Sequence, residues 1–229
     1  MSDPVDFARR IDAALGLPSL VEAVGWSDMA AVIEATLKFK TRKRSLTPSE
    51  MVESHLLLWA VGGERAEDFD HFRQDEALAE LRGHKLPAAQ TARDFLAQFH
   101  EADQPLLQDG EVPVPSESAA LQGLAAANKE LILDRQYRRP QKIATHDIDA
   151  TIIPSSKKAA KRAYDGERGY QPVLVLWAEP NVIVADEFRD GNGSAGKGNL
   201  RVIEKAVAAR PGKLDEIRLR HAEGVRGTM

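Results

Sequence analysis

Residues 143–153, with the sequence IATHDIDATII, predict a β-strand that carries two acidic side chains on one face. The segment is rich in β-branched residues, which favour strands. Successive side chains of a strand point to opposite faces, so one face is predicted to hold Asp147, Asp149 and Thr151. The other face is predicted to hold Ile148, Ala150 and Ile152. The strand is therefore amphipathic, with neighbouring carboxylates on its polar face.

Two interpretations of these carboxylates are open from the residues alone. Neighbouring carboxylates repel each other unless a cation or solvent relieves them, and hard divalent cations such as Mg²⁺ prefer oxygen ligands. Asp147 and Asp149 are therefore candidate metal ligands. In the other interpretation, the segment is an edge strand with one face in water.

The residues after this strand predict the rest of a mixed sheet. Residues 169–177 (GYQPVLVLW) and 181–188 (NVIVADEF) are two further strands by composition, joined by a turn at 178–181. A glycine-rich segment over 190–199 precedes a predicted helix over 200–209, and residues 214–219 begin a fourth strand. Such sheets usually carry helices on both sides, so we expect one face of this one to be poorly covered.

The residues before the strand predict helices. Apolar residues recur at helical spacing over 4–15, 26–39, 51–61, 64–81, 87–99 and 117–137. Thr47-Pro48-Ser49-Glu50 is a start signal, in which Thr47 caps the helix and Glu50 completes a capping box. Gly83 is predicted to end a helix and Ser116 to cap the last one. Residues 101–115, with three prolines, predict a loop.

The predicted fold class is therefore α + α/β. A helical domain, the candidate DNA-binding part, is expected over residues 1–139, and an incomplete α/β domain with a mixed sheet over residues 140–229. The three tryptophans, Trp26, Trp59 and Trp177, lie in apolar segments and are predicted to be core residues. His55 is predicted to be a buried structural histidine. The six histidines show no metal-ligand spacing.

The composition fits an ordinary globular protein. Of 229 residues, 43% are apolar and 29% are charged. There is no cysteine, so nothing indicates a disulfide framework or a thiolate zinc site. The opening residues, MSDPVDFARR, lack the apolar core of a signal peptide, and no segment has the ~20 apolar residues of a membrane span. We expect a cytoplasmic protein without a membrane partner.

The charge is unevenly distributed although the net charge is only −4. Residues 38–44 contain five basic residues and no acid, and residues 135–168 contain nine basic residues against four acids. Such blocks suit phosphate contacts, but they are equally typical of solvated faces. The candidate DNA-binding residues are Lys157, Lys158, Lys161 and Arg162 just beyond the carboxylate strand, and Arg138 and Arg139 before it.

Several motifs in order resemble one family. They are His146-Asp147-Ile148-Asp149-Ala150-Thr151, Tyr164-Asp165-Gly166-Glu167-Arg168-Gly169-Tyr170-Gln171-Pro172, and Arg189-Asp190-Gly191-Asn192 before a helix. Upstream stand GGERAEDF at 62–69, LRGH at 81–84 and LPAAQTARDFL at 86–96. Together they resemble the DDE-type transposases of bacterial insertion sequences, specifically the insertion-sequence thirteen-eighty group, over nearly the whole chain.

The resemblance implies an RNase H-like catalytic domain and DNA recombination by transposition. Asp149, in Asp149-Ala150-Thr151, takes the place of the first catalytic acid, with Asp147 as the second choice for this place and as a further metal ligand. The family's acids hold two Mg²⁺ ions, which drive in-line phosphoryl transfer on double-stranded DNA at the transposon ends. Expected partners are this DNA and another copy of the chain or a full-length transposase.

The sequence departs from the family pattern after residue 220. The family's second aspartate should follow Leu219-Arg220, but the chain reads HAEGVRGTM, in which Glu223 is a displaced acid at best, and the third acid, a glutamate, has no counterpart. We therefore expect a C-terminally truncated fragment that binds DNA but is catalytically inert by itself. One alternative is a non-catalytic DNA-binding regulator or inhibitor.

A second alternative is a nucleotide-binding α/β protein. Residues 191–197 match the phosphate-loop pattern G-x-x-x-x-G-K after a strand and before a helix. The pattern requires Ser or Thr after the lysine to ligate magnesium, and Gly198 stands there instead. A strand-to-helix turn is the simpler interpretation.

Overall fold

The computed structural model describes residues 17–25, 28–39, 45–100, 106–107, 114–209 and 214–221. The chain divides into two compact units. The first comprises Met1–Ala102 and Ser118–Ala127, and the second Asp103–Glu117 and Asn128–Met229. The helix predicted over 4–15 and most of the basic run over 38–44 lie outside the described residues.

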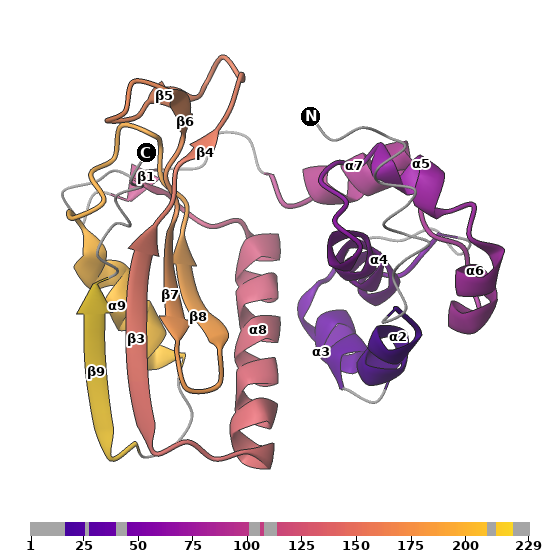
Figure 1. The fold of residues 1–229 in the computed structure, drawn as a ribbon, viewed down its shortest axis with the longest axis horizontal. Helices are drawn as coiled ribbons and strands as arrows, with labels where there is room; N and C mark the ends of the chain where they lie inside the picture. The colour runs from indigo at the N-terminus through magenta and orange to yellow at the C-terminus, as the bar shows by residue number, and fades with distance from the viewer. Residues whose placement is uncertain are drawn as a thin grey trace, which may run out of the picture. The chain divides into compact units, whose positions relative to one another are not determined.

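The first unit is helical, as predicted. Its helices are α2 (Leu17–Gly25), α3 (Met29–Thr36), α4 (Pro48–Ala60), α5 (Asp68–Phe72), α6 (Glu76–Arg82), α7 (Ala89–Ala97) and the beginning of α8 (Ala119–Arg138) (Figure 1). Helix α2 was not predicted. The buried apolar side chains of this unit's core come mainly from α4, α5 and α6, and include Leu57, Leu58, Phe69, Phe72 and Leu78.

The helix ends confirm most of the local signals. The Thr47 side chain accepts a hydrogen bond from Glu50 N, and Glu50 Oε2 accepts one from Thr47 N at 2.7 Å, so the capping box is present. Gly83 ends α6 in the left-handed region, with φ 74°. The cap of α8 was assigned to the wrong serine. Ser118 Oγ, not Ser116, accepts from Leu121 N at 3.2 Å.

Of the three tryptophans, Trp26 lies outside the described residues, and the other two differ. Trp177 is buried, as predicted, but Trp59 is 57% exposed, so its assignment to the core was wrong. Consecutive helix residues are about 100° apart, and Leu57 and Leu58 occupy the buried side of α4. Trp59 therefore faces outward, although its ring still lies 5.8 Å from the ring of His55.

The second unit is built on a four-stranded sheet with the order β8-β7-β3-β9. Its strands are β3 (Ile143–Ala150), β7 (Val173–Trp177), β8 (Val182–Glu187) and β9 (Glu216–His221). Strand β9 is parallel to β3, whereas the β3–β7 and β7–β8 pairs are antiparallel. With α9 (Asn199–Ala208) before β9, this is the mixed sheet that the sequence predicts, and the α + α/β class is confirmed.

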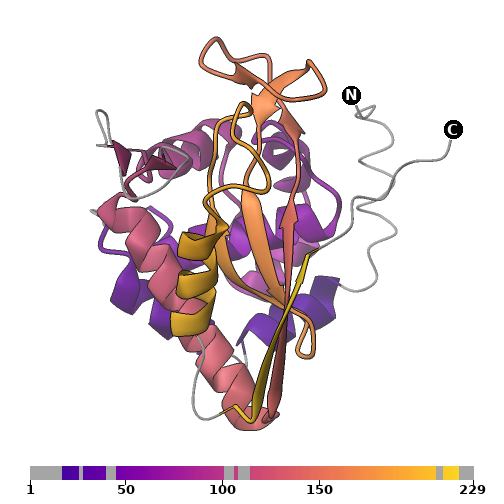
Figure 2. The same cartoon turned by 90° about the vertical axis from the view of Figure 1, so that its left-hand side faces the viewer.

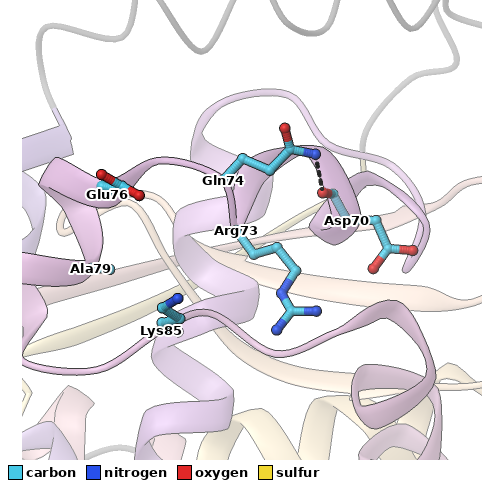
Figure 3. A pocket seen from close by; sticks show the side chains of 6 residues that line it. All are labelled: Asp70, Arg73, Gln74, Glu76, Ala79 and Lys85. Atoms are coloured by element: carbon cyan, nitrogen blue, oxygen red, sulfur yellow. Dashed lines mark hydrogen bonds between the residues drawn. The ribbon is translucent and has the colours of Figure 1, made fainter.

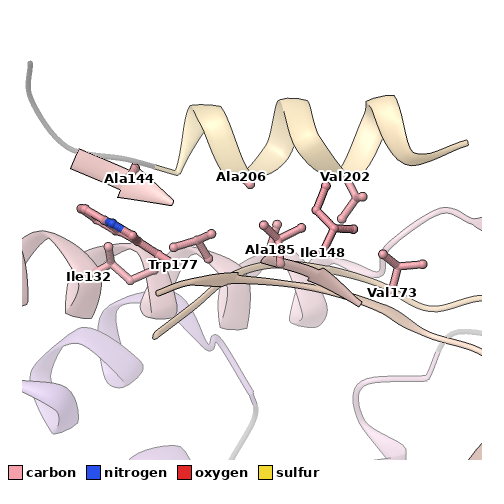
Figure 4. Close-up of a cluster of buried hydrophobic side chains, with 10 residues drawn as sticks. Ile132, Ala144, Ile148, Val173, Trp177, Ala185, Val202 and Ala206 are labelled. Atoms are coloured by element: carbon pink, nitrogen blue, oxygen red, sulfur yellow. The ribbon is translucent and has the colours of Figure 1, made fainter. Parts of the chain in front are cut away.

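Helices α8 and α9 cover the same face of this sheet (Figure 2). Val202 and Ala206 of α9 pack on strand residues that include Ile148 and Val173 (Figure 4). Ile132 of α8 joins the same cluster, and Asn128 Nδ2 donates to Ile183 O at 3.0 Å. The later turns of α8 therefore belong to the sheet unit, so the compact units do not divide at residue 139.

Within the described part of the second unit, no helix packs on the opposite face of the sheet. Leu174 and Ile183 are exposed apolar residues on this face. We call it the open face, and it is the poorly covered face that the sequence predicts. Strands β1 (Leu106–Leu107) and β2 (Val114–Pro115) form a separate short pair.

A second small sheet lies beyond the C-terminal end of β3, and the sequence did not predict it. We call it the mini-sheet; its order is β4-β6-β5, with β4 (Ile153–Pro154), β5 (Lys161–Arg162) and β6 (Arg168–Tyr170). Its strands meet closely at Gly169, where an added Cβ would stand 2.3 Å from Ile153 O. Gly191 N donates to Gly169 O at 3.1 Å, which attaches the glycine-rich loop to the mini-sheet.

Candidate functional site

The polar face of β3 forms the open face, as the alternation of side chains requires. His146 and Ile148 are buried on the helix side. Asp147 is half-buried and Asp149 is exposed on the other side. Both carboxylates therefore lie on one face of a central strand, where a ligand can reach them.

Asp147 forms an ion pair with an arginine of the neighbouring strand β9. The parallel register sets Asp147 opposite Arg220 of β9, and Arg220 Nε lies 2.9 Å from Asp147 Oδ1. This ion pair compensates one of the two negative charges. It also occupies an oxygen atom that a metal ion would otherwise take.

Among the described residues, Asp149 makes hydrogen bonds only with its close neighbours in sequence. Its Oδ1 accepts from Ala150 N at 2.9 Å, and its Oδ2 lies 3.4 Å from Thr151 Oγ1. These donors hold the carboxylate close to the backbone and leave it exposed on the open face. Asp149 is thus better placed than Asp147 to bind a cation.

The oxygen ligands on this face fit part of a site for one hard divalent cation. Asp147 and Asp149 supply the carboxylate oxygens that Mg²⁺ prefers. Within the part of the chain that the structure describes, no group of three or more acidic or histidine side chains is arranged so that it could hold a metal ion. A two-metal site needs acids from several chain segments, so the two aspartates do not fit it by themselves.

A third acid near β3 has a structural role. Glu179 Oε2 accepts from Thr145 N at 2.8 Å, and Glu179 Oε1 accepts from Thr145 Oγ1 at 2.6 Å. Burial favours the neutral acid, but these hydrogen bonds outweigh it and lower the pKa of Glu179. Its oxygens hold the turn between β7 and β8 against β3.

The glycine-rich loop is organised around a buried arginine. Arg189 is only 1% exposed, and its guanidinium donates to the carbonyls of Lys197 at 2.7 Å and Gly198 at 3.1 Å. Its Nε donates at 2.7 Å to Glu187, whose other oxygen accepts from Arg201 of α9. Burial favours the neutral form of Glu187, but the hydrogen bonds and charges of the two arginines outweigh it and lower its pKa.

This arrangement does not favour the nucleotide-binding alternative. A phosphate-binding loop directs backbone N–H groups at its ligand. Here, carbonyls of the loop converge on Arg189 instead. Strand β8 is also an antiparallel edge strand, so the loop is a turn between strand and helix.

The candidate DNA-binding residues fall into two groups that the structure does not bring together. Lys157, Lys158, Lys161 and Arg162 are all exposed on the mini-sheet and its loops, beyond the C-terminal end of β3. Arg138 and Arg139 precede the N-terminal end of that strand, and Arg138 pairs with Asp134 at 2.8 Å. An eight-residue strand separates the groups, which corresponds to roughly 25 Å.

The first unit has a hollow of its own, with a volume of about 770 Å³ (Figure 3). Its lining residues are Asp70, Arg73, Gln74, Glu76, Ala79 and Lys85. Gln74 Nε2 donates to Asp70 O at 3.0 Å. Acidic and basic side chains alternate around it, so the hollow has no single charge that would select a ligand.

The sequence predictions missed two arginines that shape the site. Arg220 contacts Asp147 only because β9 pairs with β3, which no local pattern reveals. Arg189 is buried although it is a charged residue at the start of a glycine-rich segment. A weak signal was present for Arg220, because Arg218 and Arg220 alternate with Ile217 and Leu219 along β9.

Comparisons with known proteins do not establish a family. No protein-family model matches the chain, and no curated protein matches it. A chain in the crystal structure of a pre-cleavage Mos1 transpososome is 16% identical, with 76% of this chain and 51% of that chain covered. This chain thus spans about half the length of that one. The TM-score is 0.19, too low to support a shared fold.

Proposed function

We propose that this chain is a DNA-binding protein of DNA transposition, related to the DDE-type transposases of bacterial insertion sequences. Asp149 takes the place of the first catalytic acid. The observation that carries the proposal is the position of Asp149, exposed on the open face of the central strand β3. An RNase H-like domain requires an acid at such a position.

The order of elements supports this assignment. A carboxylate strand is followed by a basic segment, a hairpin, a helix and a fourth strand. This is the order of elements that the resemblance implies. The fourth strand, β9, lies parallel to β3, and Ile148 is opposite His221. A strand continuing in this register would bring its next residue beside Asp149. That position, 222, holds an alanine in this chain, where the resemblance implies the second acid.

The chemistry of this proposal divides between two sets of residues. Asp149, with Asp147 as a second ligand once Arg220 is displaced, would hold Mg²⁺. When bound, the metal would supply charge stabilisation for phosphoryl transfer. Lys157, Lys158 and Lys161 would bind the phosphates of the DNA. Two acids on one strand do not hold two metal ions, so we expect DNA binding without strand cleavage by this chain alone.

Two measurements test the proposal. Binding of a fluorescent 30-base-pair duplex should weaken steeply with salt, because lysines release counterions from phosphates. Isothermal titration with Mn²⁺ should detect a weak site that Asp149→Asn removes, while Asp94→Asn, an exposed change on α7, leaves it intact.

Three results would contradict parts of the proposal. Failure of the duplex to bind at low salt would overturn the proposed DNA-binding function. Mn²⁺ binding unaffected by Asp149→Asn would reject the metal site and leave a non-catalytic DNA-binding regulator. Magnesium-dependent nicking of a supercoiled plasmid by the wild-type chain, but not by Asp149→Asn, would disprove the expected inertness.

A further inference from the structure

The mini-sheet carries exposed rings as well as exposed charges. Tyr164 is 86% exposed in the turn between β5 and β6, and Phe188 is 51% exposed just after β8. The ring of Phe188 lies 4.8 Å from that of Tyr170, centre to centre. Tyr170 pairs with exposed Ile153 across β4 and β6. Ile153, Tyr170 and Phe188 thus form one continuous strip, which we call the aromatic strip.

The aromatic strip faces the same way as Asp149. On β8 and the residue after it, Glu187 and Arg189 are buried on the helix side, so Phe188 between them points to the open face. Gln171 and Val173 are also buried. Because side chains alternate along the strand, Tyr170 lies on the open face. Leu174, opposite Asp149 in the register, continues the row. The strip therefore extends the carboxylate face toward the mini-sheet.

The charge around the strip is positive. Residues 153–170 contain five basic side chains and two acids. Two of the basic side chains stabilise the mini-sheet itself, because Arg168 donates to Lys158 O at 2.9 Å and Arg162 to Gly166 O at 2.9 Å. The remaining three, Lys157, Lys158 and Lys161, are exposed. No carboxylate among the described residues pairs with them.

We infer that the aromatic strip, Tyr164 and these three lysines bind unpaired nucleotides of a nucleic-acid strand. Ammonium groups bind phosphates of any strand, but a ring binds a base only through the base's flat face. In a duplex these faces are covered by stacking on both sides. An exposed aromatic strip beside unpaired lysines is therefore complementary to a strand whose bases are free.

This inference rests on the proposed DNA-binding function and makes it more specific. An unpaired nucleotide on the strip would place its backbone along the face that carries Asp149. The expected ligand is thus a single-stranded segment or a frayed end, rather than continuous duplex.

Fluorescence anisotropy with labelled oligonucleotides tests the inference. The probes are a 20-nucleotide oligothymidylate and a 20-base-pair duplex. Phe188→Ala and Tyr164→Ala should each raise the Kd for the single strand about fivefold to tenfold, the effect of removing one stacking ring. Both should leave the Kd for the duplex within about twofold. Lys158→Gln should weaken binding of both probes and reduce the salt slope for the single strand by about 0.7.

Matched controls separate stacking from loss of folding. Tyr137→Ala removes an equally exposed tyrosine, also 86% exposed, at the end of α8, and should change neither Kd. Phe188→Leu keeps an apolar contact with Tyr170 but removes the ring, and should reproduce the effect of Phe188→Ala on the single strand.

The outcomes are distinct for the two proposals. Unchanged single-strand affinity in Phe188→Leu and Tyr164→Ala, or an equal loss in Tyr137→Ala, would overturn the nucleotide site while DNA binding stands. Single-strand binding that depends on the rings, without any duplex binding by the wild type, would retain the nucleotide site and reject the proposed function.

Discussion

Arg220 reaches across from β9 to Asp147 of β3, with Nε 2.9 Å from Oδ1. The two residues are 73 positions apart in sequence and directly opposite in the parallel register. The guanidinium thus lies on the open face next to the acid at which a metal ion is expected. A cation bound at Asp147 would compete with Arg220 for this carboxylate.

Replacing Arg220 with Gln should strengthen divalent cation binding at Asp147 and Asp149, because a competing positive charge is removed. Stability should change by less than about 1 kcal/mol, since the pair is partly exposed. Mn²⁺ titration and urea unfolding measure the two effects. The control is Arg218→Gln, because Arg218 pairs with Glu216 of its own strand at 2.8 Å. Equal cation affinity in both variants would contradict the competition.

Glu187→Gln should destabilise the second unit by about 3–5 kcal/mol, because it breaks a buried ion pair and leaves Arg189 and Arg201 uncompensated. Urea unfolding followed by tryptophan fluorescence suits the measurement, since Trp177 is buried in this unit. Glu117→Gln, which breaks the more exposed pair with Lys205, is the control and should cost less than about 1 kcal/mol.

Glu187 should also make the stability of the second unit depend on pH in the acid range. Glu187 has a pKa below its ordinary value of 4.5, because the hydrogen bonds and charges of the arginines outweigh burial. Its contribution is therefore present above about pH 4.5 and is lost as the pH falls through the lower folded pKa. Wild type should lose this contribution on acidification, and Glu187→Gln should not. If the free energy of unfolding fell equally with pH in both proteins, Glu187 would not be the cause of the loss.

His55 predicts a second pH effect in the first unit. Burial lowers the pKa of His55 below its ordinary value of 6.5, although a hydrogen bond to Met51 O opposes this. In the unfolded chain, His55 therefore binds a proton near pH 6.5, whereas in the folded chain it binds one only at lower pH. The free energy of unfolding thus falls as the pH drops below about 6.5. His55→Phe should reduce this decline, measured as the urea midpoint at pH 7.5 and 5.5. The exposed His71→Phe should retain it.

Gly169→Ala should disrupt the mini-sheet, because the new Cβ would stand 2.3 Å from Ile153 O of the paired strand. Faster amide exchange at β5 and β6 should report the loss. Gly196→Ala is the control, since nothing lies within 4 Å of a Cβ there. Unchanged exchange in Gly169→Ala would mean that β4 and β6 separate readily.

Local signals in the sequence were sufficient for most elements. The capping box at Thr47 and Glu50, the stop at Gly83 and the strand predicted over 143–153 depend on neighbouring residues. The structure contains all three, although the strand ends at Ala150. Helix α2 was missed because its nine residues carry no polar cap or charged first turn. The mini-sheet was missed because two of its strands have only two residues, too short for a periodic pattern.

The candidate site was predicted only in part, because its contacts join distant segments. Alternation along one strand placed Asp147 and Asp149 on a common face, and the structure agrees. The pairing of β9 with β3 then determined that Asp147, rather than Asp149, forms an ion pair with Arg220. Arg189 can be buried because it donates to the carbonyls of Lys197 and Gly198. A hydropathy profile does not predict such hydrogen bonds. The roles of these residues in metal and DNA binding stay predictions.

The carbonyls gathered by Arg189 have a consequence for how this stretch can evolve. The Arg189 guanidinium fixes the path of the loop by binding its carbonyls, so exposed positions such as Ser194 and Gly196 should tolerate substitution. Of the two glycines in the phosphate-loop pattern, Gly191 has a structural cause, because an added Cβ would stand 2.6 Å from Gly169 O, whereas nothing lies within 4 Å of a Cβ at Gly196. Homologues of this chain are therefore expected to retain Arg189 and Glu187 more strictly than the residues at positions 194 and 196.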